Sequence, residues 1–208
     1  MTAIDYAAQI ADCEARWAKC EILPSRLKEV MTACERLVAA TAKVRYQAVE
    51  AATGVLWQNV AVIAMRESDA NFKCQLGQGD PLNEVSRHVP KGMGPYLDHP
   101  SDGPGHDAWH RCAVDTLQNT PPYAARWRVW TIGGSLCLFI QYNGEGYWLY
   151  HGHEPSPYDW GGTNQEVRGK YTSDGSFSAS LWDTQLGCAA LLKGMMQLDP
   201  SIKFAEAA

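Results

Sequence analysis

A predicted helix with apolar residues on nearly its whole circumference constrains this chain more than any other feature. Residues 55–65 are mostly apolar, and Leu56, Val60, Ile63 and Ala64 recur at intervals of three and four residues. That spacing is the period of an α-helix with one face in the core, and further apolar residues fill most of the remaining circumference. The pattern predicts a buried helix over residues 55–68.

The predicted helix ends in Arg66-Glu67-Ser68, and a glycine-rich loop follows. A carboxylate at the edge of an apolar helix loses hydration, and lost hydration raises a carboxyl pKa. A general acid that works at neutral pH needs a raised pKa. Glu67 is therefore the leading catalytic candidate.

Period and breaker residues predict the remaining elements. Further helices are expected over residues 3–21, 25–53, 107–120, 132–142 and 178–198, with Gly54 ending the second and Ser178 capping the last. Short strands are expected within residues 83–89. Two long irregular stretches, 71–105 and 143–177, favour functional or mobile loops. The fold class is mainly α (α+β), with an N-terminal helical hairpin over residues 1–54 as a packing or docking element and a main domain over 55–208.

Charge and composition exclude several classes of function. The chain of 208 residues has a formal net charge of −5, which argues against binding to nucleic acid or to an anionic membrane surface. No apolar stretch approaches the length of a membrane span, and the N-terminus lacks the pattern of a secretory signal. The seven cysteines are scattered without C-x-x-C spacing, so we expect buried, reduced thiols in a protein made in the cytosol. Eight Trp and nine Tyr fit either a surface that stacks on sugar rings or an aromatic-rich core.

Two polar residues in the first irregular stretch suit glycoside cleavage, which needs an acid and a second group for the developing oxocarbenium ion. Asp80 lies in Gly-Gln-Gly-Asp-Pro, and Ser86, six residues further on, carries a hydroxyl that can orient a water. Each also has an ordinary structural role, because Asp before Pro commonly forms turns and Ser is common in strands.

Several short motifs resemble a known family. Arg66-Glu67-Ser68 followed by Asn71-Phe72 is similar to the Glu-Ser signature of lysozyme-superfamily muramidases and lytic transglycosylases, and Gln141-Tyr142-Asn143-Gly144 is similar to their Tyr-Asn-Gly. More closely, the chain resembles lysozyme-like proteins of phages and proteobacterial prophages. The resemblance covers roughly residues 55–196 and runs through RES, QGDPLNEVSRHVPKG, PPYAARW, YNGEGY, SPYDWGGTN, GKYTSDG and QLGCAALLK.

The resemblance implies a lysozyme-like fold and cleavage of the β-1,4 bond between N-acetylmuramic acid and N-acetylglucosamine. Glu67 would be the general acid, while Asp80 and Ser86 would hold the attacking water, in place of the Asp and Thr of phage endolysins. The gap from Glu67 to Asp80 is longer than in those endolysins. The Gly-Leu-Met-Gln that follows the Glu of typical lytic transglycosylases is absent, which favours hydrolysis over transglycosylation. No cofactor is implied.

The same resemblance implies a set of sugar contacts. Tyr142 and Asn143 would hold the N-acetyl and hydroxyl groups of the sugar. Further candidate substrate-binding residues are Ser68, Asn71, His88, Tyr158, Trp160, Asn164 and Tyr171. For Tyr158, Trp160, Asn164 and Tyr171 a structural role in the loop is an open alternative.

Two other readings stay open. A metal hydrolase could use His106 and His110, spaced i, i+4, or His151 and His153 with Glu154 and Asp102, although there is no His-Glu-x-x-His. A lysozyme-shaped virion or tail component could bind peptidoglycan and cleave it poorly or not at all, with the hairpin as its docking element. Without a signal, an enzyme acting on the wall needs a holin or a phage particle to reach it.

Overall fold

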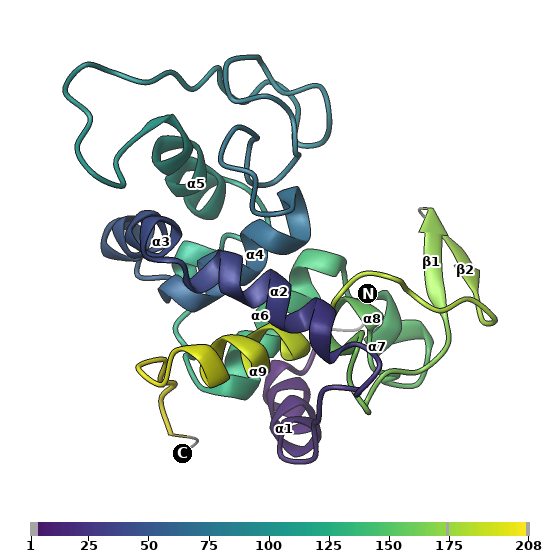
Figure 1. The fold of residues 1–208 in the computed structure, drawn as a ribbon. Helices are drawn as coiled ribbons and strands as arrows, with labels where there is room; N and C mark the ends of the chain where they lie inside the picture. Colours follow the sequence, from purple (N-terminus) through teal and green to yellow (C-terminus); the bar gives the residue numbers. More distant parts are fainter. Residues whose placement is uncertain (1–3, 174, 207–208) are drawn as a thin grey trace. The chain divides into compact units, whose positions relative to one another are not determined.

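The computed structural model describes residues 4–173 and 175–206. These residues form nine α-helices, one 3-10 turn and a two-stranded antiparallel sheet (Figure 1). The predicted mainly α class is confirmed.

The chain divides into two compact units. Unit 1 comprises Met1–Cys34 and Val129–Ala208, and unit 2 comprises Glu35–Arg128. Neither boundary coincides with residue 54, where the sequence places the end of an N-terminal hairpin. Helix α2 (Leu27–Val38) runs across the first boundary.

Unit 2 is built on three helices, α3 (Ala40–Thr53), α4 (Trp57–Ser68) and α5 (Ala108–Asn119), followed by the 3-10 turn η1 (Ala124–Arg126). Helix α3 packs against α4 and α5. The rings of Tyr46, Phe72 and Trp109 meet at this junction, with Trp109 edge-on to the other two at 5.7 and 4.9 Å.

The buried helix predicted over 55–68 is confirmed as α4. Its residues from Trp57 to Ala64 are all buried, so the helix has no solvent-facing side over two turns. Gly54 ends the preceding helix at φ 76°, as predicted, and its N–H donates to the Glu50 carbonyl. Glycine takes this left-handed conformation without steric cost.

The single helix predicted over 25–53 is wrong, because the chain breaks at Ala39 (φ −53°, ψ 136°). The break changes the phase of the buried stripe. The expected stripe ran through Thr41 and Val44, both of which are exposed. The buried residues of α3 are Ala42, Tyr46 and Val49.

Residues 69–107 form a long loop that runs around α5 (Figure 1). The strands predicted within 83–89 are wrong, since these residues form turns and bends. The backbone N–H groups of Arg87 and His88 donate to the Asp80 carboxylate, and the Ser86 hydroxyl bonds Pro90 and Met93. Local side-chain bonds thus replace the pairing that a strand would need.

Unit 1 is built around α6 (Ile132–Asn143), whose residues 133–140 are all buried. Helix α1 (Tyr6–Trp17), the short α8 (Pro157–Trp160) and α9 (Cys188–Leu198) pack against α6. A Cβ on Gly133 would lie 2.6 Å from the Ile10 carbonyl oxygen, so α1 can approach α6 only because that side chain is missing. The predicted helix at 3–21 is confirmed over Tyr6–Trp17, and Ala3 lies outside the described residues.

The helix predicted over 178–198 is wrong in its first half. Ser178 closes a hairpin of β1 (Lys170–Ser173) and β2 (Ser176–Ser178), and the last helix begins only at Cys188. A Cβ on Gly187 would lie 2.4 Å from the Gly161 nitrogen, so the chain before α9 is held in contact with the end of α8. The contact joins residues that are distant in sequence, so the local period that predicted a helix from residue 178 does not reveal it.

The cysteines and the apolar helices complete the fold. All seven cysteines are free and six are buried, as predicted; burial raises the pKa of the Cys112 thiol to about 11 and of the Cys137 thiol to about 12.

Among the described residues no single helix is long and apolar enough to cross a membrane. The pair Ala40–Thr53 and Trp57–Ser68 reaches that length and composition only when joined across a 112° bend.

Candidate functional site

Glu67 lies on the last turn of α4 and is half-buried, at the point where the fully buried part of the helix ends. Ser68, one residue on, donates its hydroxyl back to the Ala64 carbonyl at 3.1 Å. The predicted position of Glu67, at the edge of a buried helix, is therefore the position that it has.

The turn after Glu67 caps the C-terminus of α4, because the Asp69 and Ala70 N–H groups donate to the Met65 and Ala64 carbonyls. Asp69 (φ 52°) and Ala70 (φ 49°) both adopt the left-handed conformation, which is uncommon for residues other than glycine. The Arg36 guanidinium bonds both the side chain (3.1 Å) and the carbonyl (2.6 Å) of Asp69 on the surface of this turn. Consecutive left-handed residues are tolerated where the surroundings fix them, and they cluster at functional sites.

The turn that carries Asp80 lies against the end of α4. A Cβ on Gly79 (φ 70°) would be 3.7 Å from the Glu67 carbonyl oxygen. The Asp80 carbonyl accepts from the Gln75 N–H at 2.6 Å, and residues 74 and 81 form an antiparallel bridge. Glu67 and Asp80, thirteen positions apart, are thereby brought into one region of unit 2.

The Asp80 carboxylate is nearly buried, at 6 % exposure, and accepts three hydrogen bonds. The donors are the N–H of Arg87 (2.9 Å), the N–H of His88 (3.0 Å) and the His88 ring Nδ1 (2.8 Å). The His88 N–H is the largest cause that lowers the pKa of Asp80, so this side chain stays ionised. A carboxylate has about four acceptor positions, which leaves one for a water or a substrate group.

The Ser86 hydroxyl is buried and has two partners within the loop. It donates to the Pro90 carbonyl (2.8 Å) and accepts from the Met93 N–H (2.9 Å). One acceptor position remains, so Ser86 can still receive a hydrogen bond from a water but has no proton to give. Its role beside Asp80 stays a prediction.

Two more predicted binding residues of unit 2 have local partners. The Asn71 side chain accepts from the Lys73 N–H (3.0 Å) and bonds the Cys74 sulfur (3.2 Å). His88 has a side chain that is 76 % exposed and bonds Asp80, so its remaining ring nitrogen faces solvent. A binding role for Asn71 and His88 stays a prediction.

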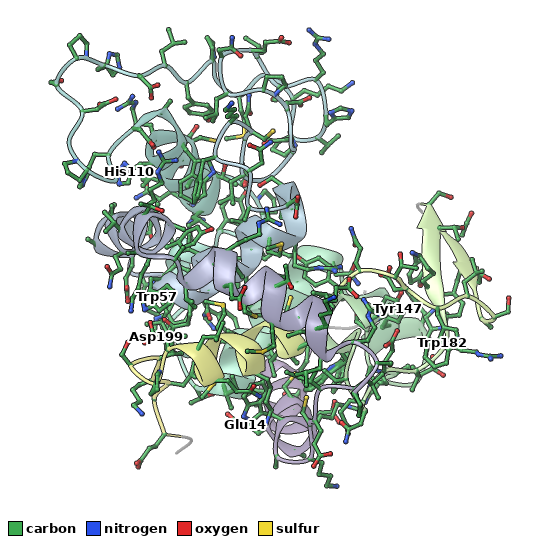
Figure 2. The ribbon with its side chains drawn as sticks, viewed as in Figure 1. Glu14, Trp57, His110, Tyr147, Trp182 and Asp199 are labelled. Atoms are coloured by element: carbon green, nitrogen blue, oxygen red, sulfur yellow. The ribbon has the colours of Figure 1, made fainter. Side chains whose placement is uncertain are left out.

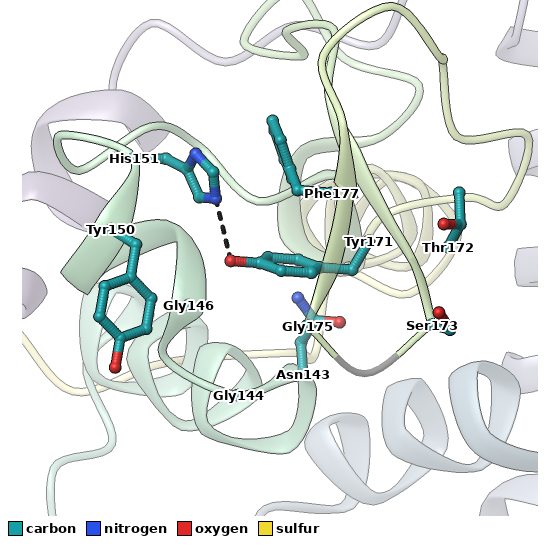
Figure 3. A pocket seen from close by; sticks show the side chains of 10 residues that line it. All are labelled: Asn143, Gly144, Gly146, Tyr150, His151, Tyr171, Thr172, Ser173, Gly175 and Phe177. Atoms are coloured by element: carbon teal, nitrogen blue, oxygen red, sulfur yellow. Dashed lines mark hydrogen bonds between the residues drawn. The ribbon is translucent and has the colours of Figure 1, made fainter.

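Unit 1 contains a cavity of about 700 Å³ between the end of α6, the short helix α7 (Gly146–Tyr150) and the β1–β2 hairpin (Figure 3). The helical side contributes Asn143, Gly144, Gly146, Tyr150 and His151. The strand side contributes Tyr171, Thr172, Ser173, Gly175 and Phe177. The volume falls within the roughly 300–1,000 Å³ that small-molecule sites occupy.

An aromatic cluster anchors the hairpin beside this cavity. Tyr147 is buried and packs edge-on against Tyr171, with ring centroids 5.3 Å apart; Figure 2 marks its place next to the hairpin. His151 stacks on Phe177 at 3.8 Å, and its Nε2 bonds the Tyr171 hydroxyl at 2.9 Å. A two-stranded sheet alone has little stability, so these contacts hold it in place.

The predicted sugar-binding residues of unit 1 divide into two groups. Asn143 and Tyr171 both line the cavity. Tyr158 and Trp160 are 7 % and 1 % exposed, and the Asn164 side chain bonds the backbone of Lys19 and Glu21, which favours the structural alternative for these three. Tyr142 is half-buried on the last turn of α6 and is not among the lining residues.

The sequence does not single out Tyr150 and Phe177 for this cavity, and it suggests His151 only as a metal ligand. No short motif joins these residues, because His151 and Tyr171 meet only through the fold. The sequence analysis also does not single out Glu145 as a perturbed carboxyl. Burial raises the pKa of this carboxyl, and its oxygen accepts a hydrogen bond from Gln9 Nε2 at 2.7 Å. Glu145 follows directly after the Tyr-Asn-Gly motif, whose neighbours could have drawn attention to it.

The histidines of the metal alternative are engaged elsewhere. The rings of His106 and His110 lie 4.7 Å apart, with His106 bonded to the Pro104 carbonyl and His110 to the Ala48 carbonyl. His153 stacks flat on Trp148 at 3.7 Å. Within residues 4–173 and 175–206 no group of three or more His, Cys, Asp or Glu side chains is placed to hold a metal ion.

Comparison with known proteins adds no further information on the site, because the chain matches no protein-family model, no curated protein and no solved structure.

Proposed function

We propose that this protein is a glycosidase that cleaves the β-1,4 bond between N-acetylmuramic acid and N-acetylglucosamine in peptidoglycan, with Glu67 as the general acid. The observation that carries the proposal is the position of Glu67. It is a half-buried carboxyl on the last turn of a buried helix, next to a turn that bears a second carboxylate.

The two carboxyl groups have different surroundings, as acid and partner should. Asp80 is held ionised by two backbone N–H groups and an imidazole, which suits a negative charge that faces a developing oxocarbenium ion. Glu67 is half-buried and follows the buried run of α4, Trp57 to Ala64, by three residues, which is the edge position proposed for the acid. Different surroundings for two carboxyls are a common source of separate acid and base roles.

In the proposed reaction, Glu67 donates its proton to the glycosidic oxygen as the bond breaks. The oxygen of the attacking water bonds to the anomeric carbon, Asp80 takes a proton from that water through its remaining acceptor position, and Ser86 accepts a hydrogen bond from the same water. The proton then passes through solvent back to Glu67, which restores both carboxyl groups. The product is then a hydrolysed glycan with a new reducing end. The resemblance of RES, QGDPLNEVSRHVPKG and YNGEGY to lysozyme-like phage and prophage proteins supports the same reaction.

The test is the release of reducing ends from purified peptidoglycan. Removing a general acid costs roughly 10²–10⁴-fold in rate. Glu67→Gln should therefore lose at least about 10²-fold. The matched control is Glu84→Gln, because Glu84 is a partly exposed carboxylate of the same loop whose side chain pairs with the exposed Arg87. Full activity in Glu67→Gln would remove the assignment of the acid.

The alternative is a peptidoglycan-binding component with little or no activity, and the aromatic cavity of unit 1 supports binding independently of Glu67. Co-sedimentation with peptidoglycan without any release of reducing ends would favour this alternative. Under either function the substrate lies outside the inner membrane, so the proposal includes a holin or a phage particle as the means of reaching it.

A further inference from the structure

We propose that the imidazole rings of His106 and His110 form a binding site for a divalent transition-metal ion such as Zn²⁺, with water as the remaining ligands. Both residues belong to unit 2, and His110 is marked in Figure 2. The inference does not rest on the proposed reaction, which uses neither histidine.

The hydrogen bonds of the two rings determine which nitrogen of each can bind a metal. His106 Nδ1 bonds the Pro104 carbonyl at 3.0 Å, and His110 Nε2 bonds the Ala48 carbonyl at 3.3 Å. A carbonyl oxygen only accepts, so each of these nitrogens carries the proton of the neutral ring and leaves a lone pair on the other nitrogen. Among the described residues none bonds His106 Nε2 or His110 Nδ1. Metal-binding histidines share this arrangement, in which the second ring nitrogen donates to a carbonyl that orients the ring.

The separation of the rings suits one shared ion. Their centroids lie 4.7 Å apart, and their planes are inclined at 50°. An ion about 2.1 Å from a ring nitrogen lies roughly 3.2 Å from the centroid of that ring, so two rings that meet one ion at about 90–110° have centroids roughly 4.5–5.2 Å apart. The observed separation falls within this range. The backbone therefore already holds the two rings at the spacing that one ion needs.

The backbone around the two rings is itself fixed. Asp107, between them, caps α5, because its side chain accepts from the His110 N–H at 3.1 Å. Directly before His106, a Cβ on Gly105 (φ 77°) would lie 2.9 Å from the Val44 carbonyl oxygen, so the chain reaches α3 only because that side chain is missing. A site held in this way loses little conformational entropy on binding.

The two ligands also select the class of ion. Neutral imidazole suits Zn²⁺, Ni²⁺ and Cu²⁺, whereas Mg²⁺ and Ca²⁺ prefer oxygen ligands. Burial lowers the pKa of the His110 ring, which keeps the ring neutral at pH 7, as a metal ligand must be. A catalytic zinc site has three protein ligands, and the described residues place no third one here. We therefore assign binding to this site and no reaction.

A bound ion would join three segments of unit 2. His106 lies at the end of the long loop over residues 69–107, His110 lies on the first turn of α5, and the Ala48 carbonyl that orients His110 belongs to α3. A ligand that binds only the folded chain raises its stability. We therefore expect Zn²⁺ to raise the melting temperature and to slow amide exchange in the part of the loop next to His106.

The experiment is a calorimetric titration of the metal-stripped full chain with ZnCl₂. It uses a Cys74→Ser background, because Cys74 is the one cysteine that is not buried and its thiol also binds Zn²⁺. We expect one saturable site and a higher melting temperature at saturating Zn²⁺, while MgCl₂ at the same concentrations gives neither. Equal binding of Mg²⁺, or no saturable binding of Zn²⁺, would overturn the inference.

His106→Ala locates the site, because it removes an exposed ring whose hydrogen bond goes to a carbonyl two residues away. We expect it to weaken Zn²⁺ binding at least about tenfold and to abolish the rise in melting temperature. The matched control is His99→Ala, another exposed histidine of the same loop, which should bind Zn²⁺ as the parent does. Unchanged Zn²⁺ affinity in His106→Ala would overturn the inference.

NMR of the ring nitrogens tests the same site without a substitution in it. In the metal-free chain we expect the proton on Nδ1 of His106 and on Nε2 of His110. Zn²⁺ should shift the signals of His106 Nε2 and His110 Nδ1 and leave those of His151 unchanged. Shifts confined to other histidines would overturn the inference. None of these measurements involves a glycan, so a failure of metal binding and a failure of the proposed glycosidase activity are separate results.

Discussion

Asp80 accepts hydrogen bonds from both the backbone N–H and the ring Nδ1 of His88, at 3.0 and 2.8 Å. The Arg87 N–H donates a third hydrogen bond, so one carboxylate accepts three hydrogen bonds from the loop that follows Pro81. The Asp80 carboxylate therefore serves two purposes: it orders its loop through hydrogen bonds, and it carries the negative charge that the proposed reaction needs.

The first prediction concerns how the stability that Asp80 contributes changes as the pH falls. Because the pKa of Asp80 is lowered in the folded protein, its contribution to stability is present above the unfolded-state pKa of about 3.9 and is lost as the pH falls through the folded-state value. Asp80→Asn should lower the melting temperature at pH 7, and the difference from the wild type should shrink as the pH falls below about 4. His88→Ala should lower it less, since both backbone bonds remain. An unchanged melting temperature in Asp80→Asn at pH 7 would contradict this role.

Glu145 gives a pH dependence of the opposite sign. Burial raises the pKa of its carboxyl, while the Gln9 hydrogen bond lowers it by less. Its contribution to stability is therefore fully present below the unfolded-state pKa and is lost as the pH rises through the folded-state value. Glu145→Gln keeps the acceptor for Gln9, and we expect it to melt higher than the wild type at pH 7 but not below about pH 4. A lower melting temperature at pH 7 would show that the charge stabilises the fold.

Arg111 should control the order of the long loop of unit 2. Its guanidinium forms a two-point ion pair with Asp102 (2.8 and 3.0 Å) and also bonds the Leu97 carbonyl. Lysine keeps the charge but cannot bond two oxygens in a plane. Arg111→Lys should speed proteolysis and amide exchange within residues 97–106, with global melting nearly unchanged. Equal protection of this segment in both proteins would contradict the clamp.

Gly194 should be essential to the packing of α9. A Cβ there would lie 2.6 Å from the Cys34 sulfur and 2.9 Å from Val30 Cγ1, both on α2 and both fully buried. Overpacking of this kind costs about 1–3 kcal/mol, partly offset by the better helix propensity of alanine. Gly194→Ala should therefore lower the free energy of unfolding, and adding Cys34→Ala should restore part of it. Gly103→Ala, where a Cβ meets nothing within 4 Å, is the neutral control.

The sequence predicts the parts of the fold that depend on local period. Helix α4, the end of α3 at Gly54 and the buried α6 all follow from apolar spacing and glycine placement. The break at Ala39 carries no breaker residue, and only the change of buried face from Thr41 to Ala42 reveals it. The hairpin at 170–178 is similarly hidden, because its stability comes from Tyr147 and His151, which are distant in sequence.

Residue type and motif propose Glu67 and Asp80 as candidates, and their roles stay predictions. The same signals could not rank the aromatic residues. Trp160 and Tyr171 look equally suited to a sugar from the sequence. The structure buries the first in α8 and places the second on a cavity wall. Trp160 is buried because α8 packs against α6 and α9, whereas Tyr171 is placed by its contacts with Tyr147 and His151. Both sets of contacts join residues that are distant in sequence.

The most direct measurement is mass spectrometry of peptidoglycan digested with the wild-type chain and with Glu67→Gln. We expect the wild-type digest to contain muropeptides that end in reducing N-acetylmuramic acid, and the Glu67→Gln digest to contain almost none. Intact glycan after exposure to the wild-type chain, or the same muropeptides from both proteins, would contradict a reaction that starts from the proton of Glu67.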